Sequence, residues 1–520
     1  MLFNSYDFIF FFLPLTLSVF FFIGKYNKQR LAMSWLVLCS LFFYGWWNPA
    51  YLVLILFSML FNYAVGTMLS NGDSAVFKKY LLWFGITLNL SFLGYYKYFN
   101  FFIEQVNLVS DSTFHLDKIL LPLAISFFTF QQIAYLVDAY RHETREYNFL
   151  HYCLFVTFFP QLIAGPIVHH KEMMPQFAQN HIYKFKYKNL AIGLTIFTIG
   201  LFKKVIFADG VAVYASPVFS AAEAGVALTF FEAWGGALAY TLQLYFDFSG
   251  YSDMAMGIAF MFGIKLPLNF NSPYKAQSII EFWRRWHMTL SRFLRDYLYF
   301  ALGGNKKGNA RRYVNLFLTM LLGGIWHGAG WTFIVWGLLH GSYLMVNHAW
   351  RKVRYDLLKW SDDIGVLETI AARALTLLAV IIGWVYFRAE TVSGANHLVA
   401  TMFAFNGISL PANLAPTLGE YSLVLNQLGI TFNGMFGGST ANLGEGIKWI
   451  LCLILLALFL PNSVQIQDKI TSFENQYNSK IFSVISQEKL ANSIALLIGL
   501  CFGWVLIHLS RVSEFLYFQF

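Results

Sequence analysis

Residues 313–347 read YVNLFLTMLLGGIWHGAGWTFIVWGLLHGSYLMVN, an apolar stretch interrupted near its middle by four glycines. A membrane-spanning helix needs about 20 residues, so this stretch is too long for a single span. Gly323, Gly324, Gly328 and Gly330 loosen a helix and let another backbone or a substrate come close. We predict two short helices joined deep in the membrane, with His327 near their junction.

The rest of the chain has the same character. Of its 520 residues, 58% are hydrophobic and only 12% are charged, against about 25% charged in an ordinary soluble domain. A soluble fold of this size is excluded because it cannot bury that much apolar surface. A disordered chain is excluded because such chains are poor in apolar residues. The apolar runs are continuous and do not alternate as in a membrane β-barrel. The sequence therefore predicts an all-α polytopic membrane protein.

Apolar windows predict about 11–13 membrane helices in one integral membrane domain spanning residues 1–520. The catalytic core is expected at about 119–347 and an external loop at about 389–447. A re-entrant piece is expected at Pro160 to Pro166, where the charge pattern breaks simple alternation. The predicted spans are 7–23, 31–47, 50–69, 80–103, 119–137, 149–168, 190–208, 226–246, 251–264, 313–347, 370–388, 447–461 and 491–509.

The formal net charge of +9 reports membrane topology, because no basic run lies in a soluble domain that could bind nucleic acid. Lys25, Lys28 and Arg30 place the first connection in the cytoplasm, so the N-terminus is predicted outside. The C-terminus is predicted outside as well. The segment 389–447 has no Lys or Arg and is expected to be external, whereas 284–312 is basic and cytoplasmic. The four cysteines are scattered, so no metal site is predicted.

Residues 281–300, EFWRRWHMTLSRFLRDYLYF, carry aromatic and aliphatic side chains at helical spacing. This pattern predicts an amphipathic helix in the cytoplasmic interface. Its arginines are either interfacial anchors or a basic mouth that attracts a phosphate-bearing donor such as coenzyme A. The candidate donor-positioning residues are Arg284, Arg285, Arg292, Arg295, Trp286 and Trp326, with Asp296 and Asn271 as supporting candidates.

His327 is the strongest catalytic candidate, since an ionisable residue inside the membrane is a functional hypothesis by default. A neutral imidazole there can take a proton from an attacking hydroxyl; the alternative is a histidine that only bonds neighbouring helices. His287 is the second candidate, against the simpler interpretation of an interfacial anchor. His340 is expected to serve packing. Asp247 and Asp253 could orient a histidine or a helix, or pair with a nearby Arg, and the structural role is favoured.

No nucleophile motif supports Ser249 or Ser291, so the pattern favours direct transfer over an acyl-enzyme route. Around the histidines the chain resembles the membrane-bound O-acyltransferases and, within them, the bacterial alginate O-acetylation branch. The similar pieces are LVDAYR at 136–141, FFPQLIAGPI at 158–167, YFDFSGYSDMA at 245–255, NFNSPY at 269–274, EFWRRWHMTLSRFLRDYLY at 281–299 and GGIWHGAGW at 323–331, and the likeness extends to the C-terminal FLYFQF.

The resemblance implies tilted helices around a thin centre, where a cytoplasmic and an external funnel meet. It implies that His327 is the catalytic histidine and His287 the second functional one. The implied reaction is acetyl transfer from acetyl-coenzyme A, a donor substrate with no bound cofactor, to an exported alginate-like polysaccharide. The resemblance also implies a location in the bacterial inner membrane, and it implies periplasmic SGNH-type transferases as partners.

Three other hypotheses remain open on the sequence. The acceptor is peptidoglycan or another exopolysaccharide, or the transferred group is D-alanine bound for teichoic acid. Alternatively the chain is an acetyl conduit or transporter without chemistry of its own, which the lack of internal repeats disfavours. A secretion scaffold is the least favoured hypothesis, because it gives no reason for a buried histidine.

Overall fold

A computed structural model describes residues 1–110, 114, 117–144, 148–360, 365–439, 441–466, 484–510 and 516. This part of the chain is almost entirely helical, which confirms the all-α prediction. Its strands form one parallel pair, β1 (Ile408–Ser409) and β2 (Ile430–Thr431). The C-terminal FLYFQF, apart from Leu516, lies outside the described residues.

The first half of the chain consists of helices joined by short connections, several of them continued through π-helical turns. They are η1 (Asp7–Phe12), α1 (Leu13–Lys25), α2 (Gln29–Gly45), α3 (Ala50–Asn71), α4 (Ala75–Leu93), η2 (Gly94–Tyr98), α5 (Phe99–Ser110), α6 (Ile125–Tyr140), α7 (Phe149–Thr157), α8 (Phe159–Leu162), α9 (His170–Phe177), η3 (Asn180–Tyr183), α10 (Tyr187–Phe202), η4 (Lys203–Ala208), α11 (Asp209–Glu223) and α12 (Phe230–Met261).

The second half contains short helical pieces, then the long pair predicted at 313–347, and then the C-terminal helices. The elements are η5 (Pro273–Lys275), α13 (Ile279–Trp283), α14 (Met288–Phe293), η6 (Leu294–Tyr299), α15 (Gly308–His327), α16 (Trp331–Lys352), η7 (Val353–Leu357), α17 (Val366–Arg388), α18 (Val392–Met402), α19 (Leu414–Leu418), α20 (Tyr421–Gln427), α21 (Leu443–Phe459) and α23 (Val484–His508).

Among the described residues, four helices are long and apolar enough to cross a membrane, which supports a multi-pass membrane protein. They are Asp7–Lys25, Ala50–Asn71, Tyr187–Glu223 and Val366–Arg388. The predicted interruption between α15 and α16 is confirmed, because Gly328 and Gly330 are extended and separate the two helices.

The prediction of two separate spans at 226–246 and 251–264 was wrong. Helix α12 is one continuous helix of 32 residues, and the polar residues that suggested a break are buried within it. Asp247 and Asp253 both pair with lysines of the adjoining η4 turn, so they need no contact with water. At about 1.5 Å per residue, α12 extends for roughly 48 Å.

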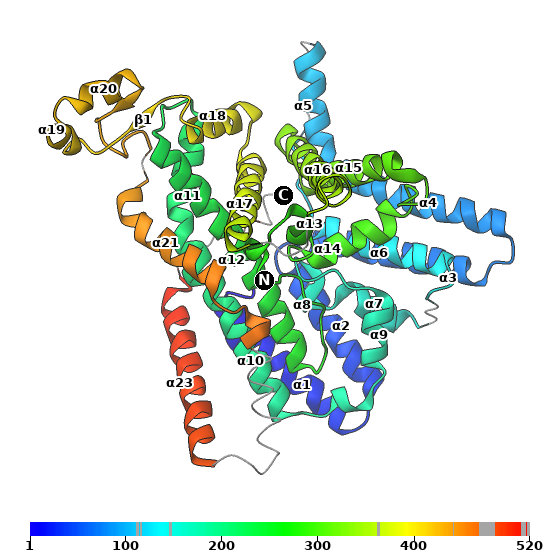
Figure 1. Cartoon of the computed structure of the whole chain (residues 1–520). Helices are drawn as coiled ribbons and strands as arrows, with labels where there is room; N and C mark the ends of the chain where they lie inside the picture. Colours follow the sequence, from blue (N-terminus) through cyan, green and yellow to red (C-terminus); the bar gives the residue numbers. More distant parts are fainter. Residues whose placement is uncertain are drawn as a thin grey trace.

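Helix α12, called the spine helix below, contributes residues to both hydrophobic cores of the molecule. In Figure 1 it lies with α10 and α1 near the centre, while α3, α4 and α6 lie side by side at the right. Its C-terminal part, including Tyr251 and Ile258, belongs to a core cluster with the N-terminal helices. Its N-terminal part, including Tyr240 and Phe248, belongs to a second cluster with α11, α17 and α18. One helix therefore ties both cores together.

Helices α10 and α12 approach until their backbones touch. A methyl group placed on Gly257 would lie 2.6 Å from the carbonyl oxygen of Gly193, and one on Gly200 would lie 2.5 Å from that of Gly250. Small residues allow this close packing, which is a usual source of helix association in membranes. The two glycine contacts, seven residues apart on each helix, fix the register of α10 against the spine.

The glycine contact gives a stability prediction. Replacing Gly257 with Leu should lower the free energy of unfolding by about 1–3 kcal/mol, since the added side chain overpacks the contact. Thermal unfolding in detergent measures this change. Gly499→Leu is the control, because nothing lies within 4 Å of a methyl group at that position. Equal melting temperatures for the two variants would contradict the packing described.

Candidate functional site

His327 is the last residue of α15 and lines a cavity. Only 9% of its surface is exposed. Its ring lies edge-on to three aromatic rings, those of Trp326, Trp336 and Phe387, at centroid distances of 4.9, 5.1 and 5.1 Å. Within the described part of the chain, no side chain is hydrogen-bonded to its imidazole. The aromatic rings hold the histidine in place and leave its nitrogens available for chemistry.

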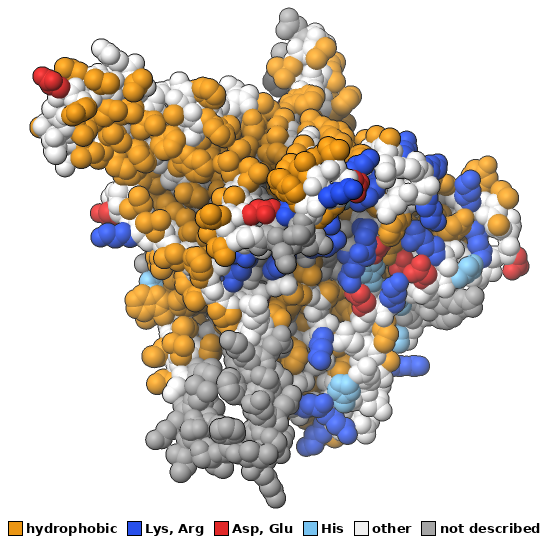
Figure 2. All heavy atoms as spheres, viewed as in Figure 1, with side chains coloured by type: hydrophobic (Ala, Val, Ile, Leu, Met, Phe, Trp, Pro, Cys, Tyr) orange, Lys and Arg blue, Asp and Glu red, His pale blue; other side chains and the backbone are white. Residues whose placement is uncertain are grey.

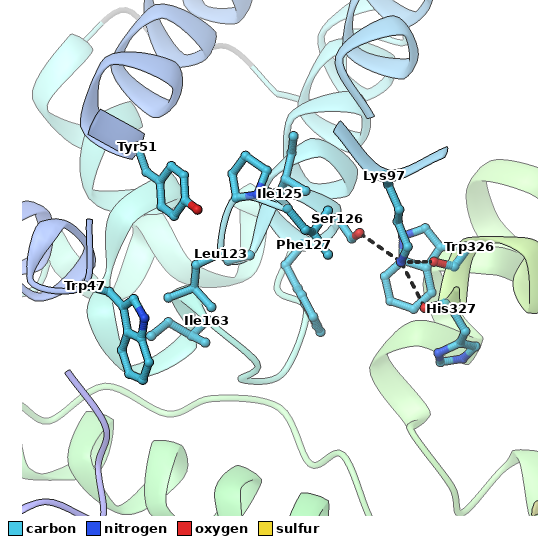
Figure 3. A pocket seen from close by; sticks show the side chains of 13 residues that line it. Trp47, Tyr51, Lys97, Leu123, Ile125, Ser126, Phe127, Ile163, Trp326 and His327 are labelled. Atoms are coloured by element: carbon cyan, nitrogen blue, oxygen red, sulfur yellow. Dashed lines mark hydrogen bonds between the residues drawn. The ribbon is translucent and has the colours of Figure 1, made fainter. Parts of the chain in front are cut away.

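The cavity beside His327 has a volume of about 130 Å³ and is shown in Figure 3. Its wall comes from the α2–α3 connection, from η2, from the segment that leads into α6, and from the end of α15. The lining residues are Trp47, Tyr51, Lys97, residues 121–127, Ile163, Trp326 and His327. A cavity of this size has room for a small group such as an acetyl.

His287 is buried and strained. It is 1% exposed, and its φ of 41° lies in the left-handed region that a residue with a Cβ rarely adopts. The helix predicted across 281–300 breaks at this residue, into α13 and α14. The interfacial-anchor interpretation of His287 was therefore wrong, because its ring packs inside the protein against Phe248 at a centroid distance of 4.7 Å.

Asn269 orients His287. Its amide nitrogen donates to Ser252 Oγ at 3.2 Å, so its Oδ1 faces His287 Nδ1 at 3.1 Å and accepts from Thr289 Oγ1 at 2.8 Å. Since Oδ1 is an acceptor, Nδ1 carries the proton and Nε2 holds the lone pair. The asparagine thus selects the tautomer of His287 and connects it to the spine helix α12.

The two histidines belong to one site. His287 contacts Phe270, which contacts Trp286 at 5.0 Å, and His327 contacts Phe387, which contacts Trp384 at 5.5 Å. Tryptophans fill the space around them: Trp286 contacts Trp384 at 4.8 Å, and Trp384 stacks on Trp336 at 6.2 Å. His340 is fully buried, its ring contacts Trp336 at 4.7 Å, and neither of its ring nitrogens has a hydrogen-bond partner among the described residues.

Three of the four predicted donor-binding arginines are in ion pairs. Arg285 pairs with Glu281 and Arg295 with Asp296, each at 2.7 Å. Arg292 makes a two-pronged pair with Glu172 at 2.6 and 2.9 Å. Arg284 is exposed. The basic mouth is therefore partly neutralised by the protein itself, and the exposed Arg284 is the member best placed to meet an anionic group.

The two predicted aspartates pair with lysines of η4 and not with an arginine. Lys203 Nζ lies 2.6 Å from Asp253 and Lys204 Nζ lies 2.6 Å from Asp247; Lys204 also contacts Asp209 at 2.7 Å. All of these groups are buried or nearly so. A buried charge is tolerated in a membrane when it is paired, so these aspartates hold η4 against α12.

The remaining candidates, Trp326 and Asn271, lie in different surroundings. Trp326 stacks on Phe130 at 4.8 Å and forms part of the His327 cavity wall. Asn271 accepts a hydrogen bond from Asn462 at 2.9 Å. Its backbone N–H donates to the carbonyl of Arg285, and its carbonyl accepts from the Arg285 guanidinium. Asn271 therefore braces the segment before α13, while its neighbour Asn269 contacts the histidine. The described residues contain no cluster of three His, Cys, Asp or Glu side chains that could hold a metal ion.

Sequence reasoning missed Lys97 and Asn269. Lys97 is a lone lysine within the predicted span 80–103, and its ammonium group lies in the wall of the His327 cavity. An intramembrane cation is a recognised signal of function, so the sequence contained the clue. Asn269 lies in the NFNSPY motif, but nothing in the motif separates it from Asn271.

The site thus consists of two buried histidines, one of them beside a cavity, in a helical membrane protein. The family model of membrane-bound O-acyltransferases matches residues 47–361. The chain belongs to this family and is an acyltransferase.

Three relatives show which proteins are similar to this chain in sequence. A peptidoglycan O-acetyltransferase of Helicobacter pylori is 42% identical over 100% of this chain and 98% of the relative. A probable alginate O-acetylase of Pseudomonas aeruginosa is 41% identical, covering 84% of this chain and 82% of the relative. A teichoic acid D-alanyltransferase of Bacillus subtilis is 31% identical, with 48% of this chain and 65% of the relative covered.

The asparagine contact gives a prediction about turnover. Asn269→Leu removes the acceptor of His287 Nδ1, so the ring loses its fixed tautomer and orientation. The rate of acyl transfer should fall by about 10- to 100-fold, as expected for a misplaced reacting group. Steady-state kinetics on purified protein measures the rate.

Asn89→Leu is the matched control, because Asn89 is also buried and pairs with Asn62, away from both histidines. This variant should lose stability and keep its turnover per folded molecule. A similar loss of turnover in both variants would show that Asn269 acts through stability alone.

Proposed function

We propose that the protein takes an acetyl group from acetyl-coenzyme A on the cytoplasmic side and passes it across the membrane for O-acetylation of an exported polysaccharide. The observation that carries the proposal is His327, a buried histidine at the end of a membrane helix whose ring borders a small cavity. The exposed Arg284 supports a donor that carries phosphates.

The proposed chemistry is direct transfer. His327 takes the proton from the acceptor hydroxyl, and the hydroxyl oxygen attacks the carbonyl carbon of the thioester. The new C–O bond forms as the C–S bond breaks, and the leaving thiolate recovers the proton from the imidazolium. Water is kept from the thioester because the surrounding shell is aromatic, which disfavours hydrolysis of the donor.

His287 has a different part in the proposal. Asn269 accepts from its Nδ1–H and so fixes its tautomer and orientation. A histidine held in one orientation suits the task of binding a polar group of the donor or acceptor. We assign it to positioning of the reacting groups, next to the base His327.

The two proposed acceptors are an alginate-like exopolysaccharide and, as the second candidate, peptidoglycan, and the coverage of their relatives separates them. The alginate-related relative matches 84% of this chain. The peptidoglycan-related relative matches all of it, including the segment 389–447 and the C-terminal helices, and this favours the second candidate. D-alanyl transfer is less favoured, since that relative matches about half of the chain.

We further propose that the protein lies in the bacterial inner membrane with both termini in the periplasm. On the face in Figure 2, Lys and Arg gather at the right and lower side, while the α19–α20 lobe at the upper left is mainly hydrophobic. The absence of Lys and Arg from residues 389–447 supports an external position for this lobe. Exposed Phe405 and Tyr421 offer a surface to a periplasmic SGNH-type partner.

The role of His327 is tested with radiolabelled acetyl-coenzyme A and purified protein in nanodiscs. His327→Ala should reduce acetyl transfer by about 100- to 10,000-fold, the usual contribution of a general base. His181→Ala is the control, because His181 is exposed on η3. Retention of acetyl flux by His327→Ala, with donor binding intact, would favour a conduit without chemistry.

The acceptor is tested in a deletion strain complemented with wild type or His327→Ala. Acetate released by mild alkali is measured separately from exopolysaccharide and from peptidoglycan. We expect the ester content of one polymer to fall to background in the His327→Ala strain. Unchanged esters in both polymers would contradict both candidate acceptors.

A further inference from the structure

Helix α15 ends inside the protein, and its last carbonyl groups need partners. The last four carbonyls of any helix have no donor within the helix. Helix α15 stops at His327 because Gly328 is extended, with φ −161° and ψ 155°. In the membrane interior water cannot satisfy such groups freely, so another part of the protein must do so.

The π-helical turn η2 supplies these donors. Tyr98 Oη donates to the carbonyl of Ile325 at 2.7 Å. Lys97 Nζ donates to the carbonyls of Trp326 at 2.6 Å and His327 at 2.9 Å, as Figure 3 shows. Two neighbouring residues, about 230 positions away in the sequence, thus hold three successive carbonyls that end with the catalytic histidine.

The ammonium group of Lys97 has no spare donor. It has three N–H bonds, and its third partner is Ser126 Oγ at 3.4 Å. Although Lys97 lines the cavity, it cannot bind an anionic substrate group without giving up one of these bonds. The same charge is well placed at a helix C-terminus, where the helix dipole favours a cation.

We propose that Lys97 and Tyr98 are positioning residues of the acyl-transfer reaction, which clamp the last turn of α15 and hold His327 at the cavity wall. The proposal rests on the proposed role of His327 as the base. The clamp acts through the backbone of His327, whose ring, among the residues that the structure describes, is held by aromatic contacts. Without it, three carbonyls lose their donors and the helix end shifts or frays.

The kinetic test compares Lys97→Met, Lys97→Arg and Tyr98→Phe. A shift of His327 by about 1 Å should lower kcat by about 100-fold in Lys97→Met, while KM for acetyl-coenzyme A stays within about twofold, since ground-state binding is unchanged. Lys97→Arg keeps charge and donors and should recover part of the rate. Lys79→Met, an exposed lysine on α4, is the control and should match wild type.

A second measurement is independent of turnover. Hydrogen–deuterium exchange followed by mass spectrometry should show faster exchange of the amides at 326–330 in Lys97→Met, and unchanged exchange in Lys79→Met. Tyr98→Phe removes one of the three carbonyl contacts and gives a milder version of the same effects if Lys97→Met does not fold.

The outcomes separate the two proposals. Faster exchange together with an inactive wild type would support the clamp and contradict acetyl transfer from acetyl-coenzyme A. Unchanged exchange at 326–330 would overturn the clamp, and so would a rise in KM at unchanged kcat in Lys97→Met, because Lys97 would then serve donor binding.

Discussion

A helix that ends inside a membrane protein must have its terminal carbonyls satisfied without bulk water, and this constraint shapes the site. Helix α15 ends at His327, where the chain turns back through Gly328 and Gly330 into α16. The break places a histidine, and not a continuous apolar surface, beside the cavity. The lysine and tyrosine of η2 make the break possible, so the chemistry of the site depends on residues remote from it in sequence.

The spine helix α12 supports the second histidine by a similar principle. Three of its buried polar residues have partners on other elements: Asp247 and Asp253 pair with the lysines of η4, and Ser252 accepts a hydrogen bond from Asn269. Asn269 in turn holds His287. The residues that make α12 unusual for a membrane helix are therefore the ones that connect it to its neighbours and to the site.

The sequence predicted most of the helices and singled out both buried histidines as candidates, because long apolar runs and intramembrane charges are local signals. It did not predict that α12 is continuous, since the pairing of Asp247 and Asp253 with Lys204 and Lys203 is a contact between helices. The break at His287 was also missed. The 281–300 pattern fits one amphipathic helix, and only tertiary contacts such as that with Asn269 stabilise the left-handed backbone there.

The two histidines are held in contrasting ways. His287 is fixed through a side-chain nitrogen, which commits its tautomer. His327 is fixed through its backbone carbonyl and the faces and edges of aromatic rings, and none of the described side chains bonds its imidazole. An acceptor at Nδ1 fixes the tautomer and orientation of a histidine, as it does for many catalytic bases, so this contact alone does not set the role of His287. The proposed role of His327 as proton acceptor follows from its place in the cavity wall, where an acceptor hydroxyl can meet its ring. On this proposal His327 carries the proton and His287 positions the reacting groups.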